Sequence, residues 1–142
     1  MNILQMSYEV PGDDFTHAGE ASSATKRALK KLGISPAVVR NVAIAMYEGE
    51  INMVIHAGGG HIDLSVTPDA VTMVLTDHGP GIPDVEKAMQ NGWSTASAEV
   101  RSMGFGAGMG LPNMKKYTDE MHIDTEVGRG TTITMTVYLN KA

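Results

Sequence analysis

Alternating apolar and polar positions predict strands at both ends of the chain. Residues 3–10 alternate well enough for one strand, and Pro11-Gly12 ends it. Residues 122–127 and 131–139 alternate on either side of the turn 128–130. The last strand has one apolar face and one face of hydroxyl side chains, so we expect a sheet with one buried side and one side facing solvent or a partner. Its apolar face comprises Ile133, Met135, Val137 and Leu139.

Two short β-rich runs in the middle of the chain predict a hairpin. Residues 61–67 and 70–76 are joined through Pro68-Asp69. The second run leads into Asp77 and then into a turn that contains Gly79 and Gly81. Glycine and proline fix such a turn, and they aim the carboxylate at the strand end. As an isolated motif this is most often a structural turn.

Helical patterns predict two long helices and two short ones. Residues 15–32 form the first, with basic residues toward its end, where they match the helix dipole, and with Gly33 as its stop. Ser35-Pro36 is typical of an N-cap followed by the first helical position. The second helix should run from there to about Ala57, where three glycines follow. The shorter helices are predicted at 84–90, capped by Asp84, and at 111–121.

The second long helix is apolar nearly all round except for one polar stripe. Glu48, Asn52 and His56 follow one another at intervals of four residues. A helix this apolar is buried, and a buried glutamate costs free energy unless it is partnered or useful in chemistry. The three polar side chains therefore either have hydrogen-bond partners and a purely structural role, or they belong to a functional site. Glu50 lies on the apolar side, and the sequence offers no explanation for it.

A run of alternate glycines precedes the helix that begins near Leu111. Alternate glycines suit neither a strand nor a helix, because each costs backbone entropy, but they suit a loop that folds closely over a ligand. The N–H groups and positive dipole end of the following helix favour an anion, most simply a phosphate. A flexible surface loop is the alternative. Residues 91–105 have no clear period, and we expect them to be mobile without a ligand. The glycines are Gly104, Gly106, Gly108 and Gly110.

Composition narrows the class of protein. The 142 residues fit one domain, residues 1–142, with one sizeable core. A formal net charge of −5 argues against a nucleic-acid binder. No apolar run is long enough for a membrane span, and the first residues do not read as a signal peptide. The absence of cysteine excludes disulfides and thiolate metal sites, so a cytoplasmic protein is the simplest fit.

Four motifs together resemble the Bergerat-fold (GHKL) ATPases, most closely the anti-sigma-factor serine kinases and the related switch kinases. The resemblance covers nearly the whole chain, and the order and spacing of the four motifs make it specific. Two rival phosphate motifs fail: a P-loop needs a Gly-Lys pair, and a dinucleotide fingerprint needs glycine where Met109 stands. The four motifs are Glu48-x3-Asn52-x3-His56-Ala57, Asp77-x-Gly79-x-Gly81, Gly106-x-Gly108-x-Gly110-Leu111 and Gly130-Thr131-Thr132.

The resemblance implies a fold and a set of roles. The fold is α/β (α+β): a two-layer sandwich with a mixed, largely antiparallel sheet, helices on one face, and ATP between helices and lid. Asp77 would read the adenine amine, Asn52 would bind Mg²⁺, and Glu48 would act as the catalytic base. Gly79 and Gly81 would let the backbone approach the base. Thr132 would add a hydroxyl or water contact near Asp77, and His56 would either brace the helix end or lie at the phosphates. The remaining ATP contacts implied are His56, Gly104, Gly106, Gly108, Gly110, Leu111, Thr131 and Thr132.

One position departs from the kinase pattern. Where those kinases have an arginine that helps with the γ-phosphate, this chain has Gly106, and Arg101 lies five residues earlier. A flexible lid could bring Arg101 to the phosphate as a second catalytic group.

The implied function is an ATP-dependent protein serine/threonine kinase. Its substrate would be a small anti-anti-sigma-like regulator. The kinase could also sequester a sigma factor, and whether it forms a homodimer is left open. One alternative is a non-catalytic module in which ATP gates protein binding. Another is the ATPase subunit of a split histidine kinase.

Overall fold

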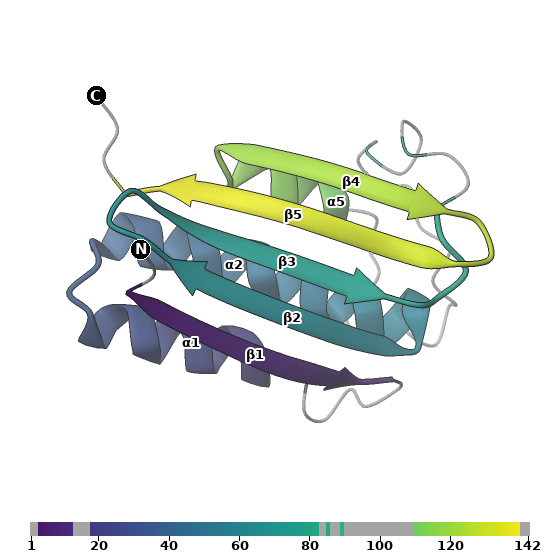
Figure 1. The fold of residues 1–142 in the computed structure, drawn as a ribbon, viewed down its shortest axis with the longest axis horizontal. Coiled ribbons are helices and arrows are strands. Elements are labelled where there is room, and N and C mark those ends of the chain that lie inside the picture. Colours follow the sequence, from purple (N-terminus) through teal and green to yellow (C-terminus); the bar gives the residue numbers. More distant parts are fainter. Residues whose placement is uncertain (1–2, 13–17, 83–84, 86–88, 90–109, 140–142) are drawn as a thin grey trace.

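Five strands form one sheet in the order β1-β2-β3-β5-β4, and the helices cover one of its faces (Figure 1). This computed structural model describes residues 3–12, 18–82, 85, 89 and 110–139. The elements are β1 (Leu4–Pro11), α1 (Glu20–Lys31), α2 (Pro36–Asn52), the π-helical turn η1 (Met53–Ala57), β2 (Gly59–Val66), β3 (Ala70–Asp77), α5 (Gly110–Lys116), β4 (Glu120–Glu126) and β5 (Gly130–Tyr138).

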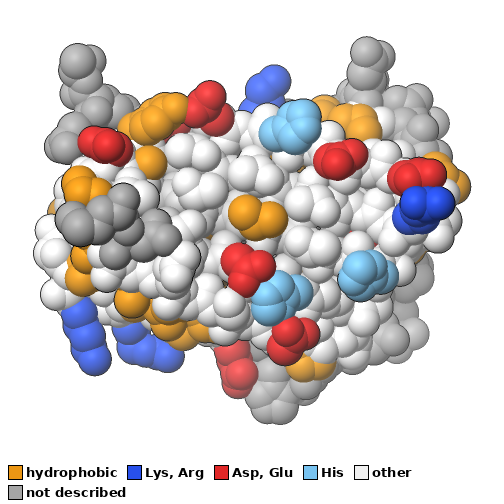
Figure 2. Space-filling model, in the orientation of Figure 1, with side chains coloured by type: hydrophobic (Ala, Val, Ile, Leu, Met, Phe, Trp, Pro, Cys, Tyr) orange, Lys and Arg blue, Asp and Glu red, His pale blue; other side chains and the backbone are white. Residues whose placement is uncertain are grey.

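The predicted two-layer fold is confirmed, and all four strand pairings are antiparallel. The hairpin of β2 and β3 and the pairing of β4 with β5 follow the alternation in the sequence. Apolar side chains of each strand point to the helices and form the core with α1, α2 and α5. No described helix covers the opposite face, and Figure 2 shows acidic and histidine side chains scattered over it.

Gly49 sets how closely α2 packs on the sheet. A Cβ at this position would overlap Cδ2 of Leu75 on β3 and would lie 3.4 Å from Sδ of Met114 on α5. The glycine therefore lets α2 lie against both the sheet and α5. This close packing brings the polar stripe of α2 to the end of the glycine-rich loop.

Helix bounds follow the sequence only in part: the helix predicted over 15–32 begins at Glu20, with Gly19 as its N-cap residue, and ends at Lys31. The Ser35 side chain accepts a hydrogen bond from the Val38 N–H, as expected for an N-cap, and Gly33 has a positive φ of 77°. The helix expected to run to Ala57 is α-helical only as far as Asn52 and then widens into η1. No helix within the described ranges is long and apolar enough to span a membrane.

The helix predicted over 111–121 is too long. α5 ends at Lys116, and Met121 belongs to β4. The Thr118 hydroxyl donates to the Met114 carbonyl at 2.8 Å, which satisfies one of the open carbonyls at the helix end. The Asp119 N–H donates to the Thr136 carbonyl at 2.9 Å, so the chain has already joined the sheet there.

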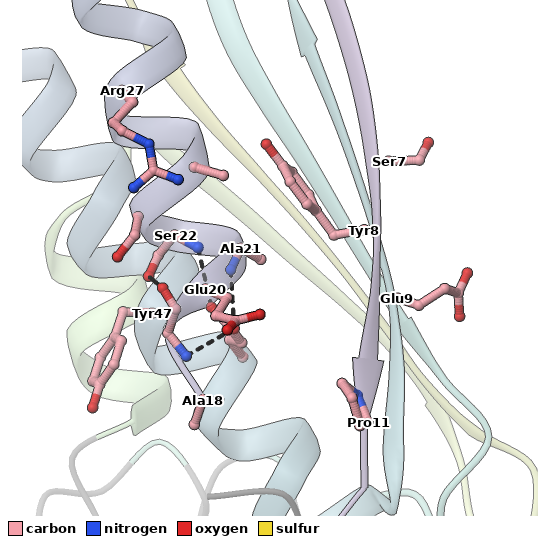
Figure 3. Close-up of a pocket in the computed structure, with 14 residues that line it drawn as sticks. Ser7, Tyr8, Glu9, Pro11, Ala18, Glu20, Ala21, Ser22, Arg27 and Tyr47 are labelled. Carbon is pink, nitrogen blue, oxygen red and sulfur yellow. Dashed lines mark hydrogen bonds between the residues drawn. The ribbon is translucent and has the colours of Figure 1, made fainter. Parts of the chain in front are cut away.

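The structure supplies the explanation for Glu50 that the sequence lacked. Glu50 is only 3% exposed, and its carboxylate accepts three backbone hydrogen bonds from the start of α1 (Figure 3). Gly19 and Ala21 donate to Oε2 at 2.8 and 3.2 Å, and Ser22 donates to Oε1 at 3.1 Å. The residue at the N-cap position is Gly19, which has no side chain to cap the helix. A carboxylate from α2 therefore caps α1.

We expect Glu50→Gln to lower the free energy of unfolding by about 1–3 kcal/mol, because an amide leaves part of this buried network unsatisfied. Glu48→Gln, on the same helix, is the matched control. Burial raises the pKa of Glu48, which means that the folded state disfavours its charged form. Removing that charge should leave stability unchanged or slightly higher at neutral pH. Urea denaturation of both variants checks this, and equal losses would contradict the capping role of Glu50.

Candidate nucleotide site

Asp77 ends β3 with its carboxylate held in place by backbone groups. The residue is 8% exposed, and its Oδ1 accepts hydrogen bonds from the Gly79 N–H at 2.9 Å and the Thr131 N–H at 3.2 Å. Within the described part of the chain, Oδ2 accepts none. One oxygen therefore fixes the carboxylate, and the other is left to accept from a ligand amine.

The glycines around Asp77 are required by contacts within the protein. A Cβ on Gly79 would lie 2.7 Å from Cα of Ala57 in η1, and a Cβ on Gly130 would overlap the Asp77 carbonyl. Gly81 has a φ of +80°, and a Cβ there would lie 2.5 Å from the Glu126 carbonyl oxygen. These contacts hold the turn after β3 against η1, β4 and β5. The glycines therefore have a structural role in addition to the expected one, in which Gly79 and Gly81 let the backbone approach the base.

Thr131, rather than Thr132, lies beside Asp77. In the antiparallel register Thr131 pairs with Asp77, and Thr132 pairs with Thr76. Side chains alternate along a strand, so Thr132 shares the open face with Thr76 and its hydroxyl is not near Asp77. The expected direct contact of the Thr132 hydroxyl with Asp77 is therefore wrong, and a contact through water stays a prediction. The Thr131 hydroxyl lies 2.8 Å from that of Thr125, which in turn accepts from the Ile82 N–H at 2.9 Å.

Glu48 is half-buried on α2 and faces the start of α5. A Cβ on Gly110 would lie 3.8 Å from Oε2 of Glu48, so the carboxylate lies close to the end of the glycine-rich loop. Burial raises the pKa of Glu48, and a hydrogen bond with the Asn113 side chain opposes that shift. Asn52 follows one turn later on the same helix. Because they are four residues apart, the Glu48 carboxylate and the Asn52 amide lie on the same side of α2, just before η1 begins.

The turn η1 joins this part of α2 to the Asp77 turn. A Cβ on Gly60 would lie 2.9 Å from Sδ of Met53 and 3.3 Å from Cβ of Asp77, while Ala57 contacts Gly79 as described above. π-helical turns are rare and occur frequently at functional sites. Residues that are far apart in the sequence are therefore brought to one end of α2.

His56 lies in η1 and is half-buried. Burial lowers the pKa of its imidazole from the ordinary value of 6.5, so the ring is mainly neutral at pH 7. A neutral ring can hydrogen-bond a phosphate but does not attract it by charge. Leu111 and Thr131, expected to contact the nucleotide, are both buried.

The side-chain oxygens available near Glu48 fit a magnesium ion that is held mainly by phosphate. The described residues contain no group of three histidine, aspartate or glutamate side chains that could hold a metal ion. Mg²⁺ keeps several waters and takes one or two protein oxygens together with substrate phosphates. The amide oxygen of Asn52, one turn from Glu48, suits such a site.

Several expected site residues lie outside the described part of the chain. They are Arg101, Gly104, Gly106 and Gly108, together with residues 91–105 and most of the predicted helix 84–90. Their roles stay predictions. The structure adds two residues that sequence reasoning missed, Asn113 beside Glu48 and Thr125 beside Thr131. An amide in the first turn after the glycine-rich loop was the available signal for Asn113; nothing local indicated Thr125.

The sequence matches the model of the histidine kinase-like ATPase domain over residues 13–137. The chain belongs to the histidine kinase-like ATPase family. ATP binding follows from this membership, and the resemblance seen in the four motifs is confirmed at this level.

Named relatives of this histidine kinase-like ATPase domain include a protein kinase and anti-sigma factors. Serine/threonine-protein kinase RsbT of Bacillus subtilis is 31% identical over 112 residues, which are 76% of this chain and 78% of RsbT. Anti-sigma F factor of Caldanaerobacter subterraneus subsp. tengcongensis is 32% identical over 108 residues, 72% of each chain. Among solved structures, the RsbU and RsbW domains of Rv1364c from Mycobacterium tuberculosis superpose with a TM-score of 0.64 at 15% identity, covering 98% of this chain and 33% of that one.

Proposed function

We propose that this protein is an ATP-dependent protein serine/threonine kinase whose substrate is a small regulator of the anti-anti-sigma type. The observation that carries the proposal is the place of Glu48. It is a half-buried carboxylate at the end of the glycine-rich loop, one helical turn before Asn52. Such a carboxylate favours catalysis over ATP binding alone, and it is shared by the histidine kinase alternative. The two named relatives, a serine/threonine kinase and an anti-sigma factor, support the same class of activity.

Each described residue has a defined task in this proposal. Asp77 accepts the adenine amine on the oxygen that the backbone leaves open. Asn52 holds Mg²⁺, which would neutralise charge on the phosphates. Glu48 orients the attacking hydroxyl and takes its proton, since phosphoryl transfer depends mostly on positioning and charge stabilisation.

Transfer of labelled phosphate tests the proposal. The purified protein, candidate regulators encoded beside its gene and γ-labelled ATP are combined with Mg²⁺. We expect label on a serine or threonine of one regulator, stable to acid. Acid-labile label would instead indicate a phosphohistidine and the split histidine kinase. Partner binding that responds to ATP without any transfer would favour the gated binding module.

The transfer rate should depend on the ionisation of Glu48. A base works only when deprotonated, and burial raises the pKa of Glu48 above the ordinary 4.5. As the pH falls, the rate should therefore begin to drop at a higher pH than an exposed glutamate would give. Single-turnover rates at saturating ATP, measured over a range of pH, give this dependence. ATP affinity is measured at the same pH values, so that the titration of ATP itself can be separated from that of Glu48. The residual rate of Glu48→Gln should lack this dependence; an unchanged profile would remove Glu48 from the step.

A further inference from the structure

The carboxylates of Glu48 and Glu50 lie two residues apart on α2 but are held in different ways. Glu50 accepts three backbone hydrogen bonds, which involve both of its oxygens. Within the described part of the chain, the Glu48 carboxylate has one hydrogen-bond partner, the side chain of Asn113 on α5. Glu50 is therefore fully engaged in capping α1, whereas Glu48 is held by one group and can still accept a further hydrogen bond.

Helix α5 presents the same face to Glu48 at Gly110 and at Asn113. A Cβ on Gly110 would lie 3.8 Å from Oε2 of Glu48. Residues three apart are neighbours on the surface of a helix, so Asn113 lies on the face that Gly110 turns toward Glu48. The place of the Asn113 side chain beside this carboxylate thus follows from the course of α5 as well as from the hydrogen bond itself.

The backbone that carries Asn113 is fixed by its neighbours. Met114, the next residue, is fully buried, and its Sδ would lie 3.4 Å from a Cβ at Gly49, the residue after Glu48. The Asn113 carbonyl accepts a hydrogen bond from the Tyr117 N–H at 3.1 Å. Packing of α5 on α2 therefore sets the distance between the amide and the carboxylate before any ligand binds.

The side-chain amide of Asn113 is the donor in this hydrogen bond. The bond lowers the pKa of Glu48 against the raising effect of burial, and a hydrogen bond does this when it favours the charged form of a carboxyl group. An amide N–H that donates to a carboxylate has that effect. Asn113 thus fixes part of the carboxylate and leaves the rest to accept from an attacking hydroxyl.

We propose that Asn113 is a positioning residue for phosphoryl transfer, whose amide holds the Glu48 carboxylate in the orientation that receives the proton of the substrate hydroxyl. This inference rests on the proposed kinase function. The hydroxyl oxygen bonds to the γ-phosphorus as the bond to ADP breaks, and the hydroxyl proton passes to Glu48. Such transfer depends mostly on positioning, and a displacement of about 1 Å can lower a rate by about 100-fold.

Kinetic coupling between the two residues tests this role. Asn113→Ala should lower the single-turnover transfer rate by about 10–100-fold and leave ATP affinity within about twofold of the wild type. In the Glu48→Gln background, the same substitution should lower the residual rate by about twofold or less, because no base is left to position. Equal losses in the two backgrounds would overturn the positioning role.

Two further variants on α5 control for structural damage. Asn113→Asp keeps the shape of the side chain but replaces its donor with a like charge, so it should lower the rate at least as much as Asn113→Ala. Lys115→Ala, at an exposed position of the same helix, should stay within about twofold of the wild type. Urea denaturation should show every variant to be folded under the assay conditions. A wild-type rate in folded Asn113→Asp would contradict the inference.

A measurement without nucleotide separates this inference from the kinase proposal. Glutamate carboxyl ¹³C resonances are recorded, and that of Glu48 is assigned by its absence in Glu48→Gln. Asn113→Ala should move this resonance and Lys115→Ala should not; a resonance that stays in place in Asn113→Ala would overturn the inference. If it moves and Asn113→Ala still transfers phosphate at the wild-type rate, only the positioning role fails. If it moves but the wild type transfers none, the kinase proposal fails, and the contact is reduced to a link between α2 and α5.

Discussion

Glu48→Gln should lower the rate of phosphoryl transfer by roughly 10²–10⁴ while leaving ATP affinity close to that of the wild type. The substitution keeps the size of the side chain and its contact with Asn113 but removes its basicity. Glu48 lies at the end of the glycine-rich loop rather than beside Asp77, so adenine recognition is unaffected. Single-turnover transfer to the regulator, together with calorimetric ATP binding, measures the two effects separately.

Two variants on the same helix serve as controls. Asn52→Ala removes the proposed magnesium ligand, so ATP binding and transfer should both suffer. Glu50→Gln should lower stability, as argued above, and should retain transfer at temperatures where the protein stays folded. If Glu48→Gln transferred phosphate at the wild-type rate, the base would have to be another residue. If the wild type transferred none but released or captured its partner on addition of ATP, the gated binding module would replace the kinase.

Asp77→Asn should weaken ATP binding by roughly 1–3 kcal/mol, about 5–150-fold. The amide oxygen of asparagine can still accept from the Gly79 and Thr131 N–H groups, so the turn should keep its shape. The amide nitrogen then takes the place of Oδ2 and presents a donor to the adenine amine, which is also a donor. The loss should therefore be confined to nucleotide recognition.

Calorimetry with ATP, ADP and GTP checks this assignment. The wild type should bind ATP and ADP with Mg²⁺ and bind GTP far more weakly, since the guanine ring presents an acceptor where adenine has its amine. Asp124→Asn on the open face of β4 is the control, and its ATP affinity should be unchanged. Equal affinity of the wild type for ATP and GTP would show that Asp77 does not read the base.

Local periodicity predicted the individual strands and helices, whereas the two-layer arrangement was implied by the resemblance to a known family. The alternation in residues 131–139 indicated which face of β5 is buried, and the Ser35-Pro36 cap marked the start of α2. Element ends were less well predicted, because they depend on partners elsewhere in the chain. The last helix stops before Met121 because Asp119 already bonds to Thr136 on β5, a contact that no local pattern contains.

The candidate site was predictable where its motifs are local. The spacing of Glu48 and Asn52 puts both on one side of an α-helix, and Asp77 with Gly79 forms a turn whose carboxylate is aimed by its own backbone. The choice between Thr131 and Thr132 was not local. It depends on the register between β3 and β5, and a shift of one residue exchanges the two faces of a strand.

The sequence by itself therefore determined the approximate positions of the described strands and helices, the polar stripe of α2 and the family to which the chain belongs. Only the tertiary structure decided what Glu50 does, because its three hydrogen-bond donors lie about thirty residues away at the start of α1. It also decided that β1 and α1 enclose a cleft between them. Capping across helices, strand register and edge exposure are long-range properties, and side-chain periodicity reports only on neighbours along the chain.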